Sequence, residues 1–252
     1  MILGQLILGQ LAKSYYIARK DVRAYYLKPP LITWGLMFPA VIMLAMYLKD
    51  PEGIHTVAPG LIAMTLLFGN TSMAAIVVTF EKRVGALERL LLAPVSRRAL
   101  IWGKVMSAAA FGLLTSTIVS ICYIIIFGHT PHRPGLLALT LLLAAVLFAS
   151  LGTFISVEVK EVFEAMTLCN YVRFPLIFVS GVFTSISVLP RLLLPFAFLS
   201  PLTYAVDAVR QSFEGEGAIF PIYLDLLILT LYGCLFFVLA VWGLERRIQK
   251  EY

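Results

Sequence analysis

Long apolar segments alternate with short polar connections along the 252 residues of this chain. A helix needs about 20 mostly apolar residues to cross a hydrocarbon core of about 30 Å, so each long segment predicts one membrane-spanning helix. Six segments meet this requirement: Leu31–Leu48, Ala58–Phe80, Ala99–Phe127, Gly135–Val157, Ala165–Val188 and Pro221–Leu244. The pattern predicts an all-α membrane protein with six transmembrane helices.

The N-terminal residues 1–28 follow a different pattern, in which apolar side chains recur every three or four positions. This spacing predicts an amphipathic helix that lies in the headgroup layer, with Lys13, Lys20 and Arg23 on its polar face. Two prolines, Pro29 and Pro30, then turn the chain into the bilayer. The apolar face is formed by Ile7, Leu11, Tyr15, Ala18, Val22 and Tyr25.

Between the fifth and sixth spans, residues 189–220 are apolar but too interrupted to form one crossing. Several Leu and Phe side chains lie between Pro190 and Pro201, and free water would not favour them. We expect one or two short helices that re-enter the membrane from the outer face. Ser180 and Gly181, near the end of the fifth span, predict either a hinge that leads into this region or a close helix contact.

Composition supports one transmembrane domain over residues 1–252. The chain is 60% hydrophobic and 13% charged, whereas soluble domains carry about 25% charged residues. The net charge of +6 collects beside the spans on one side, which places both termini in the cytoplasm by the positive-inside rule and makes nucleic acid an unfavoured partner. The basic residues on that side are Lys13, Arg19, Lys20, Arg23, Lys28, Lys82, Arg83, Arg89, Arg97, Arg98, Lys160, Arg246, Arg247 and Lys250; those opposite are Lys49, Arg133, Arg191 and Arg210.

Motifs for catalysis or cofactor binding are missing from the sequence. It contains no GxxxxGK[ST], HExxH or GxSxG, so we expect no catalytic, metal or cofactor site in this chain. The histidines His55, His129 and His132 fall in outer loops, where solvated turns are expected. All three cysteines lie inside apolar runs without metal-ligand spacing, and we expect buried, reduced thiols.

Only three ionisable residues fall within the predicted spans. Such groups cost about 2.5–3.5 kcal/mol each at a helix centre, and ion-coupled carriers usually need them. Lys104 lies near the inner end of its span and Asp225 near the outer end, so both can reach an interface. Arg173 lies deeper in the fifth span, and either an interfacial position or a wet cavity would accommodate it.

The connection between the second and third spans, residues 81–98, is longer and more charged than a turn requires. Leu87, Leu90 and Leu91 share one face of a predicted helix that ends at Pro94, and Ser96 can cap the next helix. A short rigid helix of this kind suits docking to a soluble partner, with the leucines as anchor and Glu81, Glu88 and Arg89 setting the register. The alternative is a charged anchor that only fixes topology.

This connection resembles a signature of the type 2 ABC transporter permease family, which includes bacterial drug, nodulation-factor and polysaccharide export permeases. The matching positions are Glu81, Arg83, Gly85, Leu87, Glu88, Arg89, Leu91, Pro94 and Arg97, with Ala86 where the family usually has Thr. A second stretch is also similar to the family and includes Phe174, Pro175, Ser180, Gly181, Pro190, Pro201, Tyr204 and Arg210.

The resemblance implies an export pump in the plasma membrane of a prokaryote. The pump would consist of two permease subunits, identical or homologous, and two cytoplasmic ATPase subunits that bind ATP and Mg²⁺. Residues 81–98 would form the coupling helix on the ATPase. The implied substrate path for an amphipathic or lipid-linked cargo is Phe68, Asn70, Thr71, Asn170, Tyr171, Phe174 and Phe178. The implied hinge and outer gate are Ser180, Gly181, Pro190, Pro201 and Tyr204.

Two other classes of protein fit the spans alone. An ion-coupled secondary transporter or channel would need paired charges inside the membrane, which the sequence lacks. A lipid-handling membrane scaffold or enzyme would need clustered acids or histidines at one membrane face. Glu158, Glu161 and Glu164 form such a cluster, but a charged helical face or a second contact for the ATPase is the favoured interpretation.

Overall fold

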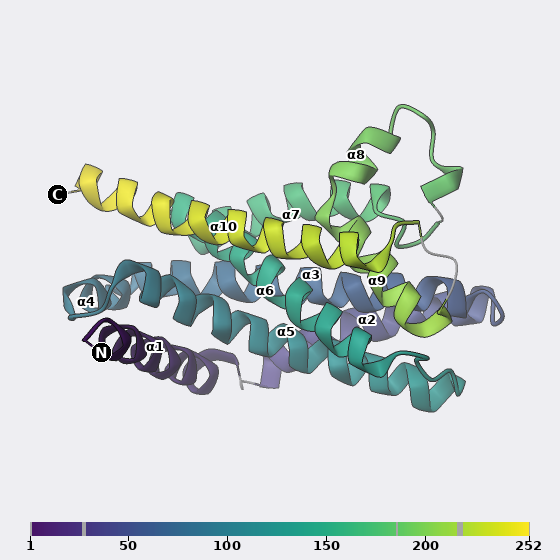
Figure 1. Ribbon diagram of the computed structural model, residues 1–252, viewed down its shortest axis with the longest axis horizontal. Coiled ribbons are helices and arrows are strands. Elements are labelled where there is room, and N and C mark those ends of the chain that lie inside the picture. The colour runs from purple at the N-terminus through teal and green to yellow at the C-terminus, as the bar shows by residue number, and fades with distance from the viewer. Residues whose placement is uncertain (1, 27–28, 185, 216–218, 252) are drawn as a thin grey trace.

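The computed structural model describes the backbone of residues 2–26, 29–184, 186–215 and 219–251, and the side chains of residues 9–26, 37–184, 186–215 and 219–249. All regular elements in these ranges are helical (Figure 1). The α-helices are α1 (Ile2–Asp21), α2 (Pro29–Lys49), α3 (Ile54–Arg83), α4 (Ala86–Leu92), α5 (Arg97–Phe127), α6 (Pro134–Glu158), α7 (Val162–Val179), α8 (Leu194–Leu199), α9 (Pro201–Glu214) and α10 (Ile222–Glu251). A π-helical turn, Val22–Tyr26, follows α1, and a 3₁₀ turn, Ile186–Val188, precedes α8.

Within the described residues, five helices are long and apolar enough to cross a membrane: α3, α5, α6, α7 and α10. They coincide with the second to sixth predicted spans. Helix α2 coincides with the first, and its described side chains form a shorter apolar stretch, Met37–Lys49. The all-helical class is therefore confirmed, and the sixth crossing stays a prediction.

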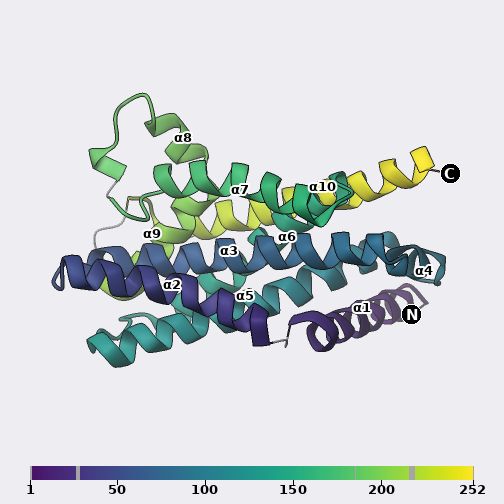
Figure 2. The ribbon, with the colours of Figure 1, turned by 180° about the vertical axis from the view of Figure 1, so that it is seen from behind.

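The long helices run side by side, and the short ones lie at the two ends of the bundle. Helix α4 and both ends of the described chain lie at the same end, whereas α9 lies at the opposite end, as the two opposed views in Figures 1 and 2 agree. This arrangement agrees with an even number of crossings. Which end faces the cytoplasm stays a prediction from the charge distribution.

Helix α6 lies at the centre of the bundle, where it packs against α3, α5, α9 and α10. The helices approach closely because small residues line the contacts. A Cβ atom at Gly152 would lie 2.6 Å from the Cα atom of Thr71 in α3, a distance that no side chain tolerates. Glycine at this position therefore sets the spacing between α3 and α6.

The fifth span ends earlier than the predicted Ala165–Val188, at the Ser180–Gly181 pair for which a hinge or a close helix contact was predicted. Helix α7 ends at Val179, and Gly181 adopts a left-handed conformation with φ 76° that stops the helix. The Oγ atom of Ser180 lies 2.6 Å from that of Ser200, which ties this helix end to the start of α9. Ser180 and Gly181 therefore terminate α7 and contact the start of α9, and their role as a hinge stays a prediction.

The outer region forms two short α-helices, as predicted, but they differ in burial. In α8 most of the side chains are exposed, whereas in α9 every residue from Pro201 to Phe213 is buried among α3, α6 and α10. Tyr204 donates a hydrogen bond to the carbonyl of Phe198, and so links the two helices at 2.7 Å. Re-entry into the membrane stays a prediction. Arg210, expected among the solvated outer charges, is instead buried in α9.

Helix α1 packs along α5 with a face different from the predicted apolar one. Ser14, Ile17 and Asp21 are buried against α5, while Leu11 and Tyr15 are exposed. The expected apolar stripe is thus divided between protein contact and an outer face that remains suited to the headgroup layer. The close approach depends on Gly103, where an added Cβ atom would lie 2.9 Å from Ile17 side-chain atoms and the Ser14 carbonyl oxygen.

Candidate functional site

Helix α4 is held rigidly at the end of the bundle by its flanking turns. Gly85, with φ 66°, turns the chain between α3 and α4 in a left-handed conformation that other residues disfavour. After α4, the Oγ atom of Ser96 accepts a hydrogen bond from the Ala99 amide at 3.2 Å and caps α5, as predicted. Helix α1 adds a further tie, because Lys13 donates to the Pro94 carbonyl.

The face that α4 presents differs from the predicted docking face. Leu87 is buried, and Leu90 and Leu91 are partly buried against the protein's own core, so these leucines hold α4 in place and are not free to anchor a partner. The exposed side chains are Glu88, Arg89 and Leu92 of α4, together with Arg83, Pro94 and Arg97 beside it. Leu92, which the motif analysis missed, is 88% exposed. It lies one helical turn after Glu88 and Arg89 and is an exposed apolar side chain on that charged face.

Glu81 does not belong to the docking surface either. It is fully buried in the last turns of α3 and contacts Lys104 of α5 and Lys20 of α1. Lys104 is 1% exposed and does not extend to an interface, and its Nζ atom lies 2.8 Å from Oδ2 of Asp21. The reason for both corrections is the same: the two predicted surface charges neutralise each other inside the protein.

Together, Lys20, Asp21, Glu81 and Lys104 form a buried charge cluster that joins α1, α3 and α5 just behind α4. The Nζ atom of Lys20 lies 2.6 Å from Oε1 of Glu81 and 3.0 Å from Oδ1 of Asp21. Burial, with help from the nearby Glu81 carboxylate, raises the pKa of Asp21, while Lys104 opposes that shift. The cluster ties the end of α3, which leads into α4, to α1 and α5.

A second exposed segment lies beside α4, where α6 connects to α7. Glu158, Lys160, Glu161 and Glu164 are all exposed there, and so is Phe163. Lys82 at the end of α3 donates to the carbonyls of Val157 and Val159 at 3.0 and 3.1 Å, which links this connection to the root of α4. The acidic cluster predicted from the sequence therefore lies at the same end of the bundle as α4.

The predicted substrate path is brought together only in part. A cavity of about 370 Å³ is lined by residues of α2, α3, α5 and α7, including Phe68 and Asn170 from the predicted set. Phe174 lies close to it, with its ring centroid 6.5 Å from that of Phe68, and Thr71 bonds to Arg173 at the cavity wall. We call this space the arginine cavity. The lining residues are Phe38, Pro39, Phe68, Gly69, Ser72, Met73, Ile76, Phe111, Met166, Asn170 and Arg173.

Three predicted path residues point elsewhere. Asn70 faces Gly112 of α5 on another side of α3 and does not line the cavity. Tyr171 and Phe178 lie on the outer face of α7 and are widely exposed. These two side chains form an apolar strip along α7 that the described part of this chain does not cover.

Arg173 is buried inside the bundle, so the interfacial alternative is wrong. It is 1% exposed, and its guanidinium donates to Thr71, Ser72 and Asn170. Asp225 is also buried, at the start of α10, where it accepts a hydrogen bond from Gln211 at 2.8 Å. Asp207 accepts from the amides of residues 219 and 220 and holds the connection between α9 and α10.

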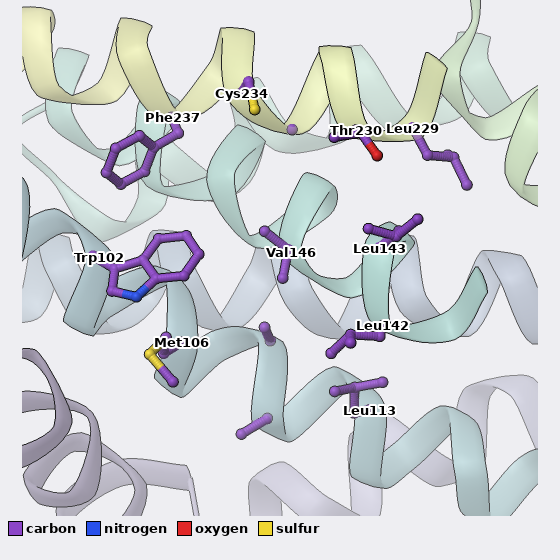
Figure 3. Close-up of a pocket in the computed structure, with 13 residues that line it drawn as sticks. Trp102, Met106, Leu113, Leu142, Leu143, Val146, Leu229, Thr230, Cys234 and Phe237 are labelled. Carbon is purple, nitrogen blue, oxygen red and sulfur yellow. The ribbon is translucent and has the colours of Figure 1, made fainter. Parts of the chain in front are cut away.

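A larger cavity of about 540 Å³ lies between α5, α6 and α10, as Figure 3 shows. The indole of Trp102 faces the ring of Phe237 at one end, with 5.5 Å between ring centroids. Its lining is hydrocarbon apart from the indole N–H of Trp102, the sulfur atoms of Met106 and Cys234, and the hydroxyl of Thr230, which donates to the carbonyl of Leu226. This space, here called the apolar cavity, can accommodate an acyl chain and has no charged side chain in its lining.

His55 and His129 pack against each other and are only partly exposed, whereas His132 is exposed in its loop, as predicted. The His55 and His129 ring centroids are 4.9 Å apart, and Nδ1 of His55 lies 2.8 Å from the hydroxyl of Tyr123. Burial, with His55 close by, lowers the pKa of His129. Among the described residues, no group of three or more His, Cys, Asp and Glu side chains is placed to hold a metal ion.

The cysteines are free, and only one of them is buried. Cys169 lies inside the bundle, whereas Cys122 and Cys234 are exposed on helix faces. The expectation of three buried thiols is therefore wrong for two positions, because an apolar run that faces lipid looks the same in sequence as one that faces the core.

Comparisons with known proteins fit this geometry. The family model described as ABC-2 type transporter matches residues 13–213. The inner membrane transport permease YadH of Escherichia coli K12 is 28% identical over 235 residues, which cover 88% of this chain and 87% of that protein. The putative transport permease ycf38 of Porphyra purpurea is 24% identical over 206 residues, 75% of this chain and 69% of the relative. ABC transporter G family member 20 of Dictyostelium discoideum is 27% identical over 168 residues, but these cover only 23% of that longer protein.

Proposed function

We propose that this chain, which belongs to the ABC-2 type transporter family and is the membrane permease of an ABC transporter, exports an amphipathic or lipid-linked substrate. A cytoplasmic ABC ATPase on a separate chain binds ATP and Mg²⁺ and drives the cycle. The observation that carries the proposal is α4, a short rigid helix with an exposed charged face, located at the end of the bundle that holds both termini.

In this proposal α4 is the element that receives the ATPase. Leu92 provides the apolar anchor, since a buried hydrophobic side chain surrounded by a polar rim is typical of interface hot spots. Glu88 and Arg89 provide opposite charges that fix the register of the partner. The exposed Phe163 and the acids near it extend the same contact surface.

The step from ATPase to substrate follows from how α4 is connected. ATP-driven closure of the ATPases moves α4, and the buried charge cluster transmits that movement to α1, α3 and α5 as one body. Since α3 also lines the arginine cavity, its displacement changes the shape of the space that holds the substrate. Such a rigid-body shift alternates access only if ATP binding favours one of the two arrangements.

A second permease subunit, identical or homologous, covers the exposed apolar face of α7 in this proposal. Tyr171, Phe174 and Phe178 recur on that face and are all exposed. Aromatic side chains are enriched at protein–protein interfaces relative to the rest of the protein surface. It would place the arginine cavities of the two subunits near a common axis, through which an amphipathic cargo could pass.

The test is affinity purification of the chain from mildly solubilised membranes, with ATPase activity measured in the eluate. The variant Leu92→Asp places a charge where the anchor should be buried, and Glu88→Ala with Arg89→Ala removes the register. Leu192→Asp is the matched control, because Leu192 is 86% exposed at the opposite end.

We expect ATPase capture to fall at least about tenfold for Leu92→Asp, since an unpaired charge in an interface costs more than about 1.4 kcal/mol. The control should retain full capture. If the Leu92 and Glu88/Arg89 variants both recover an ABC ATPase as well as the parent chain, α4 is not the docking element. A chain that elutes without any ATPase would favour the ion-coupled carrier instead.

A further inference from the structure

Arg173 carries a positive charge into the interior of the bundle, and no described acidic side chain pairs with it. Its Nε atom donates to Oγ1 of Thr71 at 2.6 Å, Nη2 to Oγ of Ser72 at 2.8 Å, and Nη1 to Oδ1 of Asn170 at 3.2 Å. All three acceptors are neutral. None of the ion pairs among the described side chains includes Arg173.

A buried charge is normally paired with an opposite one, because burial removes the water that stabilises it. This chain follows that rule at Lys104, which is equally buried and contacts two carboxylates. Among the described side chains, the only additional compensation at Arg173 is the ring of Phe68, whose centroid lies 5.0 Å from the guanidinium carbon. Arg210 is also buried and belongs to none of these ion pairs, but its guanidinium donates to the carbonyls of Thr56 and Gly181 and does not line the arginine cavity. The contrast between Lys104 and Arg173 therefore points to a counter-charge for Arg173 from outside the chain.

The surroundings of Arg173 are suited to a ligand that has both a charge and an apolar body. The guanidinium lies in the wall of the arginine cavity, whose volume of about 370 Å³ falls within the usual range for small-molecule sites. Apart from Ser72, Asn170 and Arg173, the lining is apolar, with the rings of Phe38 and Phe111 among it. The three hydrogen bonds to Thr71, Ser72 and Asn170 use three of the five N–H donors of an arginine, so donors remain for a further acceptor.

We infer that the arginine cavity binds an amphipathic anion, with a carboxylate or phosphate head on Arg173 and a hydrocarbon or aromatic body against the phenylalanines. The planar guanidinium matches both head groups through paired, charge-assisted hydrogen bonds. That the anion is the transported substrate rests on the proposed function; that it binds rests on this chain alone. Its source is either an anionic lipid of the bilayer or a separate amphiphile.

The test uses the chain in lipid nanodiscs of phosphatidylcholine and two photoactivatable probes with the same diazirine-bearing alkyl chain. One probe ends in a carboxylate and the other in a trimethylammonium group, and labelled peptides are identified by mass spectrometry. We expect the carboxylate probe to label peptides that contain Met73 or Met166, and dodecanoate to compete for this labelling. The apolar cavity of Figure 3, near Cys234, should be labelled equally by both probes and is the internal control.

Two variants separate charge from shape. Arg173→Gln should reduce carboxylate labelling of the arginine cavity at least about tenfold, the effect of losing a hydrogen bond to a charged group. Arg173→Lys retains the charge and should retain part of the labelling. Labelling of the apolar cavity must be unchanged in both variants, which verifies that the bundle is folded.

The proposal is overturned if the arginine cavity takes both probes equally, or if Arg173→Gln leaves the carboxylate labelling unchanged. Phosphatidylglycerol added to the nanodiscs identifies the source, because competition by this lipid assigns the site to bilayer lipid and its absence assigns it to a separate amphiphile. ATPase capture is measured on the same samples. Charge-selective labelling without capture would refute the proposed function but leave this inference intact, and capture without selectivity would do the reverse.

Discussion

Removal of Lys104 tests whether the buried charge cluster holds the base of α4. In the variant Lys104→Met the carboxylates of Asp21 and Glu81 stay buried, but the cation between them is lost. Methionine fills a similar volume without charge, so the change is electrostatic more than steric. Lys20 is then the remaining cation of the cluster.

The expected loss can be estimated from burial. Removing one partner of a buried ion pair costs about 3–5 kcal/mol, because the other charge is left uncompensated. Lys20 can return at most about 1 kcal/mol, since its side chain is 43% exposed and water screens its attraction. A net loss of about 2–4 kcal/mol would lower the melting temperature of a chain of this size by roughly 4–16 °C.

The measurement is thermal unfolding in detergent micelles, followed by the fluorescence of the three tryptophans. Arg98→Met is the matched control, because this exposed cation lies near the start of the same helix and should change stability by no more than about 0.5 kcal/mol. Adding Asp21→Asn and Glu81→Gln to Lys104→Met removes the stranded charges and should recover most of the loss. The reasoning fails if Lys104→Met melts within about 2 °C of the parent, or if the triple variant melts below the single one.

The remaining predictions concern helix spacing and pH. Gly152→Ala forces a methyl group to within 2.6 Å of Thr71 Cα, so we expect the free energy of unfolding to fall by about 1–3 kcal/mol. Gly233→Ala, with its nearest neighbour at 3.6 Å, should be tolerated. Equal melting temperatures of the two variants would contradict the close approach of α3 and α6. Because the pKa of His129 is lowered in the folded protein, the unfolded chain binds more protons near pH 6, and stability should fall as the pH drops from about 7 to 5. His129→Gln should weaken that dependence, and an unchanged pH profile of the melting temperature would show that the histidine is not responsible.

Local sequence patterns were sufficient to predict most of the long helices and the C-terminal end of α4. Long apolar segments gave α3, α5, α6 and α10 nearly in full, because the period of a helix and the thickness of a bilayer act on consecutive residues. Pro94 and Ser96 marked the boundary between α4 and α5, since capping and proline effects are also local. The end of α7 was missed, as a left-handed glycine next to a serine reads equally well as a hinge.

The assignment of charges to surface or interior could not be made in the same way. Glu81 and Lys104 are 23 positions apart, and Lys104 and Asp21 are 83 apart, so nothing in either neighbourhood announces the pairing. Each charge alone suggests an exposed position. The packing of α1 and α3 against α5 brings these charged side chains into contact, and their opposite charges then compensate one another inside the protein.

The sequence by itself determined that this chain is a helical membrane protein with a short charged helix between two of its spans, because hydropathy and helix signals are carried by neighbouring residues. Only the tertiary structure decided which faces of the helices meet. It turned Leu87 inward and Leu92 outward on α4, divided the apolar face of α1, and brought Arg173 to the wall of a cavity without an acid beside it. These outcomes depend on the close approach of helices at small residues such as Gly103 and Gly152, and such contacts join positions far apart in the chain.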